Sequence, residues 1–362
     1  MFKIGKIKFS SNKTVLIAEA GVNHNGSIKF AKKLIDKAKQ AGCDIIKFQT
    51  YKAEKLTTKN APRFWNWSGE RKKKGSQFDS YSNLDSFNKN HYKTLIKYCK
   101  KKNIEFLSTP FDKEAVDMLV SIGMRGFKIA SCDITNIELL KYIAKKKLPI
   151  LLSTGASNLS EIRDAVNIIK KCGNKKILIM HCTLCYPTSP KDANLKAINT
   201  IRNEFPNELV GLSDHTLGID IASASIPLGV SAIEKHFTFN NKLKKSADHW
   251  LSILPKDLKI LKNRCKLINN AMGSGKKSVL SCEVKARKFA RRSIVSKYKL
   301  KKNHKIQLKD LDFKRPGTGL NPKEIKKILG KKLRKNINRD YIFKLTDIKW
   351  RLVLLFKQEV AL

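Results

Sequence analysis

The chain has 362 residues, of which 41% are hydrophobic, so it is long enough for one large domain with a buried core and a second, smaller domain. No apolar run approaches the roughly 18 residues of a membrane helix, and residues 1–11 lack the apolar core of a signal peptide. The eight cysteines lack the spacing of a disulfide framework. We therefore expect a cytoplasmic protein without membrane contact. The net charge of +45 comes mostly from lysines spread along the chain, which predicts solvated basic surfaces that attract anionic substrates rather than a specific nucleic-acid site.

The first part of the chain alternates between short apolar runs and helix-like segments. The helix-like segments include residues 28–41, 113–122 and 159–171. Apolar strands that alternate with helices are typical of a parallel sheet covered on both faces, and eight such units predict an α/β fold, a closed (β/α)8 TIM barrel. The predicted strands are residues 14–20, 44–49, 104–108, 126–130, 149–153, 176–181, 209–213 and 232–236.

The pattern also predicts the domain boundaries. We expect a barrel domain at residues 1–265, a linker at 266–285, a small β-rich domain at 286–350 and a C-terminal tail at 351–362. A long insertion at residues 51–90 follows the second predicted strand and is rich in Lys, Ser, Asn and aromatic residues. At this position it is predicted to cover the barrel mouth as a loop or lid.

Polar side chains lie at the carboxyl ends of the predicted strands, where barrel enzymes keep their active sites. His215 and His236 end successive strands, and two neighbouring imidazoles suit a divalent cation with open coordination positions. Glu234 lies near the same face and is a candidate acid, base or partner of a metal ligand. Asp214 either orients an imidazole or caps the next helix.

Two lysines at other strand ends predict an anion site. Lys47 and Lys128 should point toward the mouth, where a lysine needs an anion to offset the loss of hydration. Thr109, Ser131 and Ser153 add hydroxyl donors, and the turn after Ser153 precedes a helix whose first amides can bind phosphate. Together these residues predict a phosphate cage.

Glu19 ends the first predicted strand, next to the polar segment at residues 23–25. A carboxylate in this place either binds a sugar hydroxyl or moves a proton. A salt bridge to Lys47 is the structural alternative, and it does not exclude the other two roles.

Taken in chain order, the strand-end motifs resemble those of the sialic acid synthase family over nearly the whole chain. The C-terminal domain resembles the antifreeze-like (SAF) domain of that family, with its Lys-Arg-Pro-Gly-x-Gly turn at residues 314–319. The matching segments are residues 17–26 (IAEAGVNHNG), 47–50 (KFQT), 108–111 (STPF), 153–155 (STG), 181–183 (HCT), 211–216 (GLSDHT), 234–237 (EKHF) and 247–249 (ADH).

The resemblance implies a TIM barrel followed by an SAF domain, a domain-swapped homodimer, and a Mn²⁺ or Mg²⁺ ion bound by His215 and His236. The phosphoenolpyruvate ligands that it implies are Lys47, Thr109, Lys128, Ser131, Ser153 and Tyr186. The residues that it places near the amino sugar are Glu19, Gln49, Asp133, Asp248 and, reaching across from the partner subunit, Arg315. Three positions depart from the family: Leu184 replaces a residue that is often polar, Asp133 stands where glutamate is common, and Arg291 stands where a lysine occurs.

The function implied by the resemblance is condensation of phosphoenolpyruvate with open-chain N-acetylmannosamine, or a related N-acylated hexosamine, to give a nonulosonic (sialic) acid and phosphate. Glu19, Glu234 and Lys47 are the expected catalytic residues. Legionaminic and pseudaminic acid synthases share these motifs and use 2,4-diacetamido trideoxyhexoses, and they stay open as an alternative. A non-catalytic protein that binds polyanions is suggested by the net charge alone, and the complete set of strand-end residues argues against it.

Overall fold

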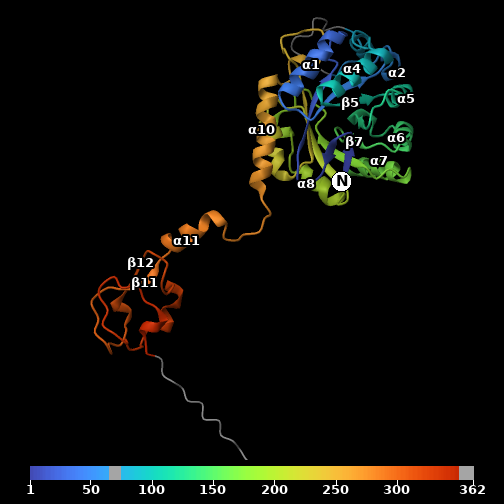
Figure 1. The fold of residues 1–362 in the computed structure, drawn as a ribbon. Helices are drawn as coiled ribbons and strands as arrows, with labels where there is room; N and C mark the ends of the chain where they lie inside the picture. The colour runs from blue at the N-terminus through green and yellow to red at the C-terminus, as the bar shows by residue number, and fades with distance from the viewer. Residues whose placement is uncertain (65–74, 350–362) are drawn as a thin grey trace, which may run out of the picture. The chain divides into compact units, whose positions relative to one another are not determined.

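The computed structural model describes residues 1–64 and 75–349. The chain divides into two compact units, Met1–Ser274 and Gly275–Leu362, which run from blue to orange and from orange to red in Figure 1. The predicted tail at residues 351–362 lies outside the described residues. Every helix in the described part of the chain is too short or too polar to cross a bilayer.

A nearly closed barrel of eight parallel strands forms the first unit, and all eight predicted strands are confirmed. The strands are β3 (Val15–Gly21), β4 (Ile45–Thr50), β5 (Glu105–Pro110), β6 (Phe127–Ile129), β7 (Ile150–Ser153), β8 (Ile177–Cys182), β9 (Leu209–Asp214) and β10 (Ala232–His236). They follow the order β5-β4-β3-β10-β9-β8-β7-β6. The two edge strands, β5 and β6, lie next to each other and so nearly close the barrel. This is the predicted TIM-barrel architecture.

Helices surround the strands (Figure 1), and the longer ones bury apolar residues in the cluster against the barrel. In α1 (Ile28–Gln40), the buried residues recur at the spacing of one helix face: Ala31, Leu34, Ile35 and Ala38. Further helices of this unit are α2 (Ala53–Leu56), α3 (Gln77–Ser82), α4 (Lys89–Lys102), α5 (Lys113–Ser121), α6 (Ile137–Lys145), α7 (Leu159–Lys171), α8 (Ala197–Glu204), α9 (Asp220–Ser225) and α10 (Pro255–Met272). The helical segments predicted from the sequence correspond to α1, α5 and α7.

Helix α10 extends into the segment predicted as a linker. It continues to Met272, so residues 266–272 are helical. Gly273 follows with φ of +59°, a conformation that glycine adopts without strain and that ends the helix. The two units separate between Ser274 and Gly275.

Side chains along each strand alternate between the inside of the barrel and the surrounding helices. One apolar cluster fills the inside: Val15, Ile17, Ile45, Leu107, Leu151, Leu178, Met180 and Ala232. The residues between them, such as Leu16, Ile46 and Ile233, pack against the helices. Because residues two apart share a face, the next inward positions point into the mouth, and polar residues and a cysteine occupy them: Glu19, Lys47, Thr109, Ser153, Cys182 and Glu234.

A short hairpin that the sequence did not predict packs against the opposite end of the inner cluster. Its strands, β1 (Phe2–Ile4) and β2 (Ile7–Phe9), pair antiparallel. The rings of Phe2 and Phe9 stack with their centroids 5.1 Å apart, and both join the inner apolar cluster. Three-residue strands are too short for a hydrophobic period to be read, which is why the sequence did not indicate them.

The Phe9→Ala variant should lose about 3–5 kcal/mol of the free energy of unfolding, because the fully buried ring leaves a cavity in the apolar cluster. Urea unfolding of the full chain measures this loss. If the variant unfolds at the wild-type urea concentration, the hairpin does not contribute to the stability of the barrel.

The second unit folds around its own core of short strands and turns. Strands β11 (Ser293–Ser296) and β12 (Leu311–Lys314) pair antiparallel, and helix α11 (Val284–Ala290) precedes them. The fully buried members of the core are Ile294, Ile328, Leu333, Phe343 and Ile348. The predicted small β-rich domain is therefore present.

The turn after β12 is fixed by hydrogen bonds and by a close backbone approach. The Ser293 hydroxyl donates to the Pro316 carbonyl (2.6 Å) and accepts from the Gly319 amide (2.9 Å). A Cβ atom on Gly319 would lie 2.2 Å from Ile342 and 2.6 Å from the Phe343 carbonyl oxygen. Only glycine fits there, so the Gly-x-Gly part of this turn has a structural cause.

Candidate active site

The polar strand ends line a chamber at the mouth of the barrel, which we call the inner chamber. Its cavity volume is about 320 Å³. It brings together residues that are up to about two hundred positions apart in the sequence, as the shared carboxyl end of parallel strands predicts. The predicted site residues that line it are Glu19, Lys47, Gln49, Thr109, Lys128, Ser131, Asp133, Ser153, Tyr186, His215, Glu234 and His236.

Two buried lysines and two buried carboxylates form a charge network in the inner chamber. The Lys47 Nζ atom lies 2.7 Å from Glu19 Oε2 and 3.7 Å from Glu234 Oε1. The Lys128 Nζ atom lies 3.5 Å from the same Glu234 oxygen. Lys47 also donates a hydrogen bond to the Thr109 hydroxyl (3.1 Å). The alternative salt bridge between Glu19 and Lys47 is therefore present, and the network as a whole is neutral when all four groups are charged.

The two carboxylates differ in proton affinity. Burial raises the pKa of Glu19, and the nearby Lys47 only partly offsets this effect. Burial also acts on Glu234, but Lys128 and Lys47 outweigh it and hold the pKa of Glu234 below its usual value. Glu19 therefore binds a proton more strongly than Glu234 does, a difference that suits acid and base roles in one site.

His215 and His236 face each other across the inner chamber with ring centroids 5.4 Å apart. The Nδ1 atom of His215 lies 2.8 Å from the Thr183 carbonyl oxygen, so Nδ1 carries the proton and Nε2 keeps its lone pair. Burial holds the pKa of His236 well below its usual value, so this ring is neutral. The Tyr186 ring covers His215 at 4.2 Å between centroids.

These two imidazoles fit an open metal site. Across residues 1–64 and 75–349, no group of three His, Cys, Asp or Glu side chains could hold a metal ion. A cation would therefore have His215 and His236 as protein ligands and leave its other positions to substrate or water. The Nδ1 atom of His236 is buried and has no hydrogen-bond partner among the described residues, which is consistent with a ligand taking that place.

Among the described residues, Asp214 forms no hydrogen bond or ion pair with an imidazole, and it does not cap the next helix. It lies on the outer face of β9, where its Oδ2 atom is 2.7 Å from Lys235 Nζ. Its Oδ1 atom accepts a hydrogen bond from the Thr216 amide (2.9 Å). Helix α9 begins only at Asp220, too far along the chain for Asp214 to cap it.

Hydroxyl and amide donors collect beside Lys128. Ser131 accepts a hydrogen bond from the Gly155 amide at 2.9 Å. A Cβ atom on Gly155 would lie 2.8 Å from that hydroxyl, so glycine allows this close approach. The hydroxyl of Ser153 is buried without a hydrogen-bond partner among the described residues. A buried polar group of this kind indicates a missing ligand, here one with acceptor oxygens.

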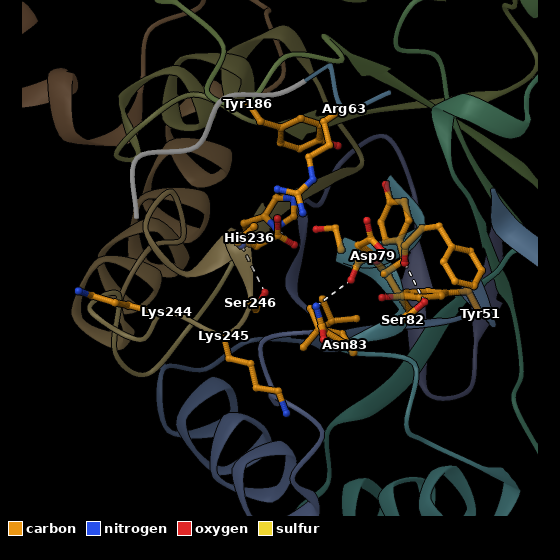
Figure 2. Close-up of a pocket in the computed structure, with 18 of the residues that line it drawn as sticks. Tyr51, Arg63, Asp79, Ser82, Asn83, Tyr186, His236, Lys244, Lys245 and Ser246 are labelled. Carbon is orange, nitrogen blue, oxygen red and sulfur yellow. Dashed lines mark hydrogen bonds and ion pairs between the residues drawn. The ribbon is translucent and has the colours of Figure 1, made fainter. Parts of the chain in front are cut away.

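A second cavity, the outer chamber, opens directly from the inner one and has a volume of about 690 Å³ (Figure 2). The residues that line both chambers include Gln49, Tyr81, Tyr186 and His236. The described parts of the 51–90 insertion form much of its wall, in the place where the sequence predicted a lid. The apolar lining consists of Val22, Tyr51, Phe64, Phe78, Tyr81 and Leu84.

Asp248 lines the outer chamber near the histidine pair. Its Oδ2 atom lies 3.7 Å from His236 Nδ1, and burial, with the charge of Glu19, raises the pKa of Asp248 to about 7. Gln49 donates a hydrogen bond to Glu19 (2.9 Å) and so connects the two chambers. Both residues are thus placed where a ligand would pass from one chamber to the other.

The remaining predicted site residue, Arg315, lies in the second unit. It is exposed on the turn that follows β12. Its contact with a sugar in a partner's mouth stays a prediction. The sequence did not single out Tyr51 or Tyr81. It placed Cys182 at a strand end without giving it a role in the site, although alternation along β8 places it in the mouth.

The chain is similar to known proteins over most of its length. Residues 34–277 match the model of the NeuB family, and residues 291–349 match the SAF domain. The chain is 41% identical over 334 residues to an N,N'-diacetyllegionaminic acid synthase of Campylobacter jejuni, which covers 92% of this chain and 99% of the relative. It is 39% identical over 337 residues to a Legionella pneumophila protein of the same name, covering 92% and 94%. The crystal structure of a sialic acid synthetase from Leptospira borgpetersenii, in complex with citrate, matches with a TM-score of 0.70 at 36% identity, covering 79% of this chain and 94% of that one.

Proposed function

The chain belongs to the NeuB family, and from this membership and the two chambers we propose that it condenses phosphoenolpyruvate with an open-chain 2,4-diacetamido trideoxyhexose to give N,N'-diacetyllegionaminic acid and phosphate. The observation that supports this choice of sugar is the similarity, at 41% and 39% identity over 92% of the chain, to two proteins that carry this name. Formation of N-acetylneuraminate from N-acetylmannosamine is the second candidate, supported by the similarity to the Leptospira structure.

The inner chamber suits phosphoenolpyruvate. Lys47 and Lys128 supply two buried positive charges, and Ser131 and Ser153 supply hydroxyl groups beside them. The carboxylate and the phosphate of this substrate are both anionic, so the two ammonium groups can donate charge-assisted hydrogen bonds to them. The unpaired Ser153 hydroxyl is available to donate to one of these oxygens.

The outer chamber suits the sugar. Its wall combines polar groups, such as Gln49 and Asp248, with the aromatic rings of Tyr51 and Tyr81. A diacetamido trideoxyhexose carries two N-acetyl methyl groups and a C6 methyl group, which gain from contact with apolar surface. N-acetylmannosamine has hydroxyl groups at C4 and C6 instead and would gain less from such a wall.

The proposed reaction joins C3 of phosphoenolpyruvate to the aldehyde carbon of the open-chain sugar. A divalent cation held by His215 and His236 would polarise the aldehyde oxygen as a Lewis acid. As the new C–C bond forms, C2 becomes electron-poor and water adds to it. The tetrahedral intermediate then breaks its C2–O bond to phosphate and leaves a 2-keto acid, so one water is consumed and one phosphate released.

The two carboxyl groups handle the protons in this scheme. Glu19, whose pKa is raised, donates a proton to the aldehyde oxygen as it becomes a hydroxyl group. Glu234, whose pKa is lowered, accepts a proton from the water that adds to C2. Lys47 contacts both carboxylates and keeps their charges in balance while the proton positions change.

The test is phosphate release from phosphoenolpyruvate in the presence of Mn²⁺, with separate sugars as the second substrate. We expect kcat/KM to be at least about a hundredfold higher for 2,4-diacetamido-2,4,6-trideoxymannose than for N-acetylmannosamine, because a polar substituent in an apolar wall leaves its hydrogen bonds unmade. EDTA should stop the reaction, and added Mn²⁺ should restore it.

Each other outcome has a defined meaning. A preference for N-acetylmannosamine would replace the proposed product with N-acetylneuraminate and keep the chemistry. A preference for the diacetamido sugar of the altro series would point to pseudaminic acid. Release that persists in EDTA would contradict the metal site.

A further inference from the structure

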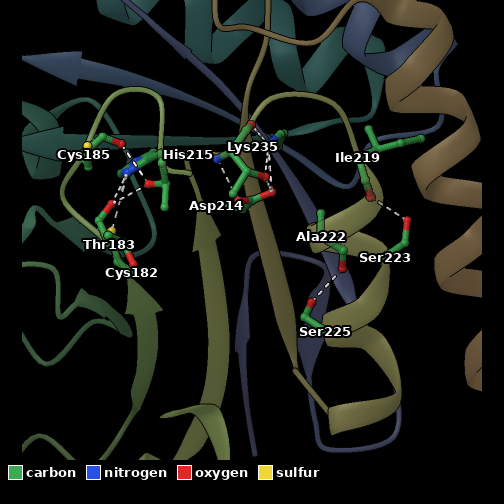
Figure 3. A network of polar contacts seen from close by, with 12 residues as sticks. Cys182, Thr183, Cys185, Asp214, His215, Ile219, Ala222, Ser223, Ser225 and Lys235 are labelled. Atoms are coloured by element: carbon green, nitrogen blue, oxygen red, sulfur yellow. Dashed lines mark hydrogen bonds and ion pairs between the residues drawn. The ribbon is translucent and has the colours of Figure 1, made fainter. Parts of the chain in front are cut away.

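Lys235 and Asp214 form a buried ion pair on the outer face of the strands that carry His215 and His236, and the proposed reaction does not use it. Lys235 lies between Glu234 and His236 on β10, and its side chain is 1% exposed. Its Nζ atom is 2.7 Å from Asp214 Oδ2 and also donates to the Thr216 carbonyl (Figure 3). Both Lys235 and Asp214 point away from the mouth, and neither lines the inner or the outer chamber.

The position of this pair relative to the two histidines is specific. In the sheet, Lys235 of β10 is in register with Asp214 of β9. Asp214 immediately precedes His215 and Thr216 immediately follows it, so the single ammonium group of Lys235 contacts the residues on both sides of that histidine. His236 is the next residue after Lys235 itself. The contacts therefore connect the backbone segments that carry the two imidazoles.

The turn after β9 has few other fixed points. The Asp214 carboxylate accepts hydrogen bonds from the Thr216 amide (2.9 Å) and hydroxyl (3.1 Å). On the other side, the Thr188 amide donates to the His215 carbonyl (3.0 Å). Lys235 is the group that links this turn to β10, because the backbone pairing between β9 and β10 ends at Lys235 and Asp214.

A buried ion pair adds little net stability compared with an apolar pair of similar size. Stability alone therefore does not explain why the Lys235–Asp214 pair lies buried between the barrel strands and the helices. A role in fixing geometry does account for it. We propose that Lys235 is a positioning residue that, through Asp214 and Thr216, sets the separation and orientation of His215 and His236 for divalent cation binding. This inference rests on the proposed function of the two histidines as cation ligands.

The experiment is a titration of the metal-free full-length protein with Mn²⁺. Electron paramagnetic resonance measures the free Mn²⁺ at each step. The Lys235→Met variant should bind Mn²⁺ about 10- to 100-fold more weakly than the wild type, the usual effect of losing a residue that orients metal ligands. The Mn²⁺ concentration for half-maximal activity should rise by a similar factor, while kcat at saturating Mn²⁺ should stay within about threefold of wild type.

Arg125→Met is the matched control. Arg125 pairs with the buried Glu105 at 2.7 Å near the opposite ends of β5 and β6, so its loss also leaves a buried carboxylate without its cation. Its Mn²⁺ affinity should equal that of the wild type even if its stability falls. If Lys235→Met does not fold, the double variant K235M/D214N removes both charges and should fold while still binding Mn²⁺ weakly.

The outcomes separate the inference from the proposed function. Wild-type Mn²⁺ affinity in both Lys235→Met and K235M/D214N would overturn the positioning role and leave the histidine site intact. Equal weakening in Arg125→Met would also overturn it, because the effect would then reflect general loss of stability. If the wild type itself binds no Mn²⁺, the histidine pair is not a metal site and both ideas fail.

Discussion

His215→Ala should reduce phosphate release from phosphoenolpyruvate by about a thousandfold or more at any Mn²⁺ concentration. The variant loses one of the two imidazoles that we propose as cation ligands, whose ring centroids lie 5.4 Å apart. Lewis-acid stabilisation is worth several kcal/mol, and about 4 kcal/mol corresponds to this factor in rate. The measurement is the initial rate of phosphate release together with Mn²⁺ binding to the metal-free protein.

His181→Ala is the control for this variant. His181 is the next-to-last residue of β8, two strands from His236, and is as buried as His215 (7% exposed). Its Nε2 atom lies 2.8 Å from the Ala193 carbonyl oxygen, so both variants lose a buried ring and one hydrogen bond to a carbonyl group. His181 points outward, however, and lines neither chamber. It should lose stability but keep Mn²⁺ binding. Full activity in His215→Ala would contradict the proposed metal site.

The strand-end residues were predictable because barrel geometry brings the ends of all the strands to one place. A polar residue two positions after a buried apolar one, such as Glu19 after Ile17 or Lys47 after Ile45, lies on the same inward face. That rule requires no knowledge of the loops. It accounts for the prediction that Glu19, Lys47 and the two histidines converge at the mouth.

The same alternation, applied more strictly, predicts that Asp214 lies on the outer face of its strand. This residue lies between Ser213 and His215, which both line the inner chamber, so it must point outward. Lys235 lies between Glu234 and His236 and points outward for the same reason. The sequence therefore contained the signal for a pair on the outer face, although the cross-strand register that joins the two residues needed the structure.

The outer chamber was harder to predict than the inner one. Tyr51, Phe64 and Tyr81 come from an insertion with short helices, where neither a strand period nor a helix period extends far enough to be read. Contacts between such segments depend on tertiary packing, as in the T-shaped arrangement of the Tyr51 and Tyr81 rings, whose centroids are 5.5 Å apart. The identity of the sugar therefore depends on the part of the site that sequence patterns describe least.

Lys47→Met should lower the free energy of unfolding by about 3–5 kcal/mol at pH 8, because it leaves the buried carboxylates of Glu19 and Glu234 with one lysine instead of two. The loss should be smaller at pH 5. Burial already raises the pKa of Glu19, and without Lys47 it rises further, so the folded protein takes up a proton there as the pH falls. A carboxyl group whose pKa is higher in the folded than in the unfolded protein destabilises the fold increasingly as the pH rises above its unfolded-state pKa. The loss of stability should therefore be larger at pH 8 than at pH 5.

The double variant K47M/E19Q distinguishes the structural role of Lys47 from its chemical role. Replacing Glu19 with glutamine restores neutrality, with Lys128 and Glu234 left as a pair 3.5 Å apart, so most of the lost stability should return in urea unfolding. Activity should not return, because the lysine that is proposed to contact phosphoenolpyruvate and the proposed acid are both absent, and the rate of phosphate release should stay at least about a thousandfold below wild type. If the double variant regains activity along with stability, Lys47 serves only to balance the charge of Glu19. If Lys47→Met is as stable at pH 8 as the wild type, the four charged groups do not form the network described, and the proton roles assigned to Glu19 and Glu234 lose their basis.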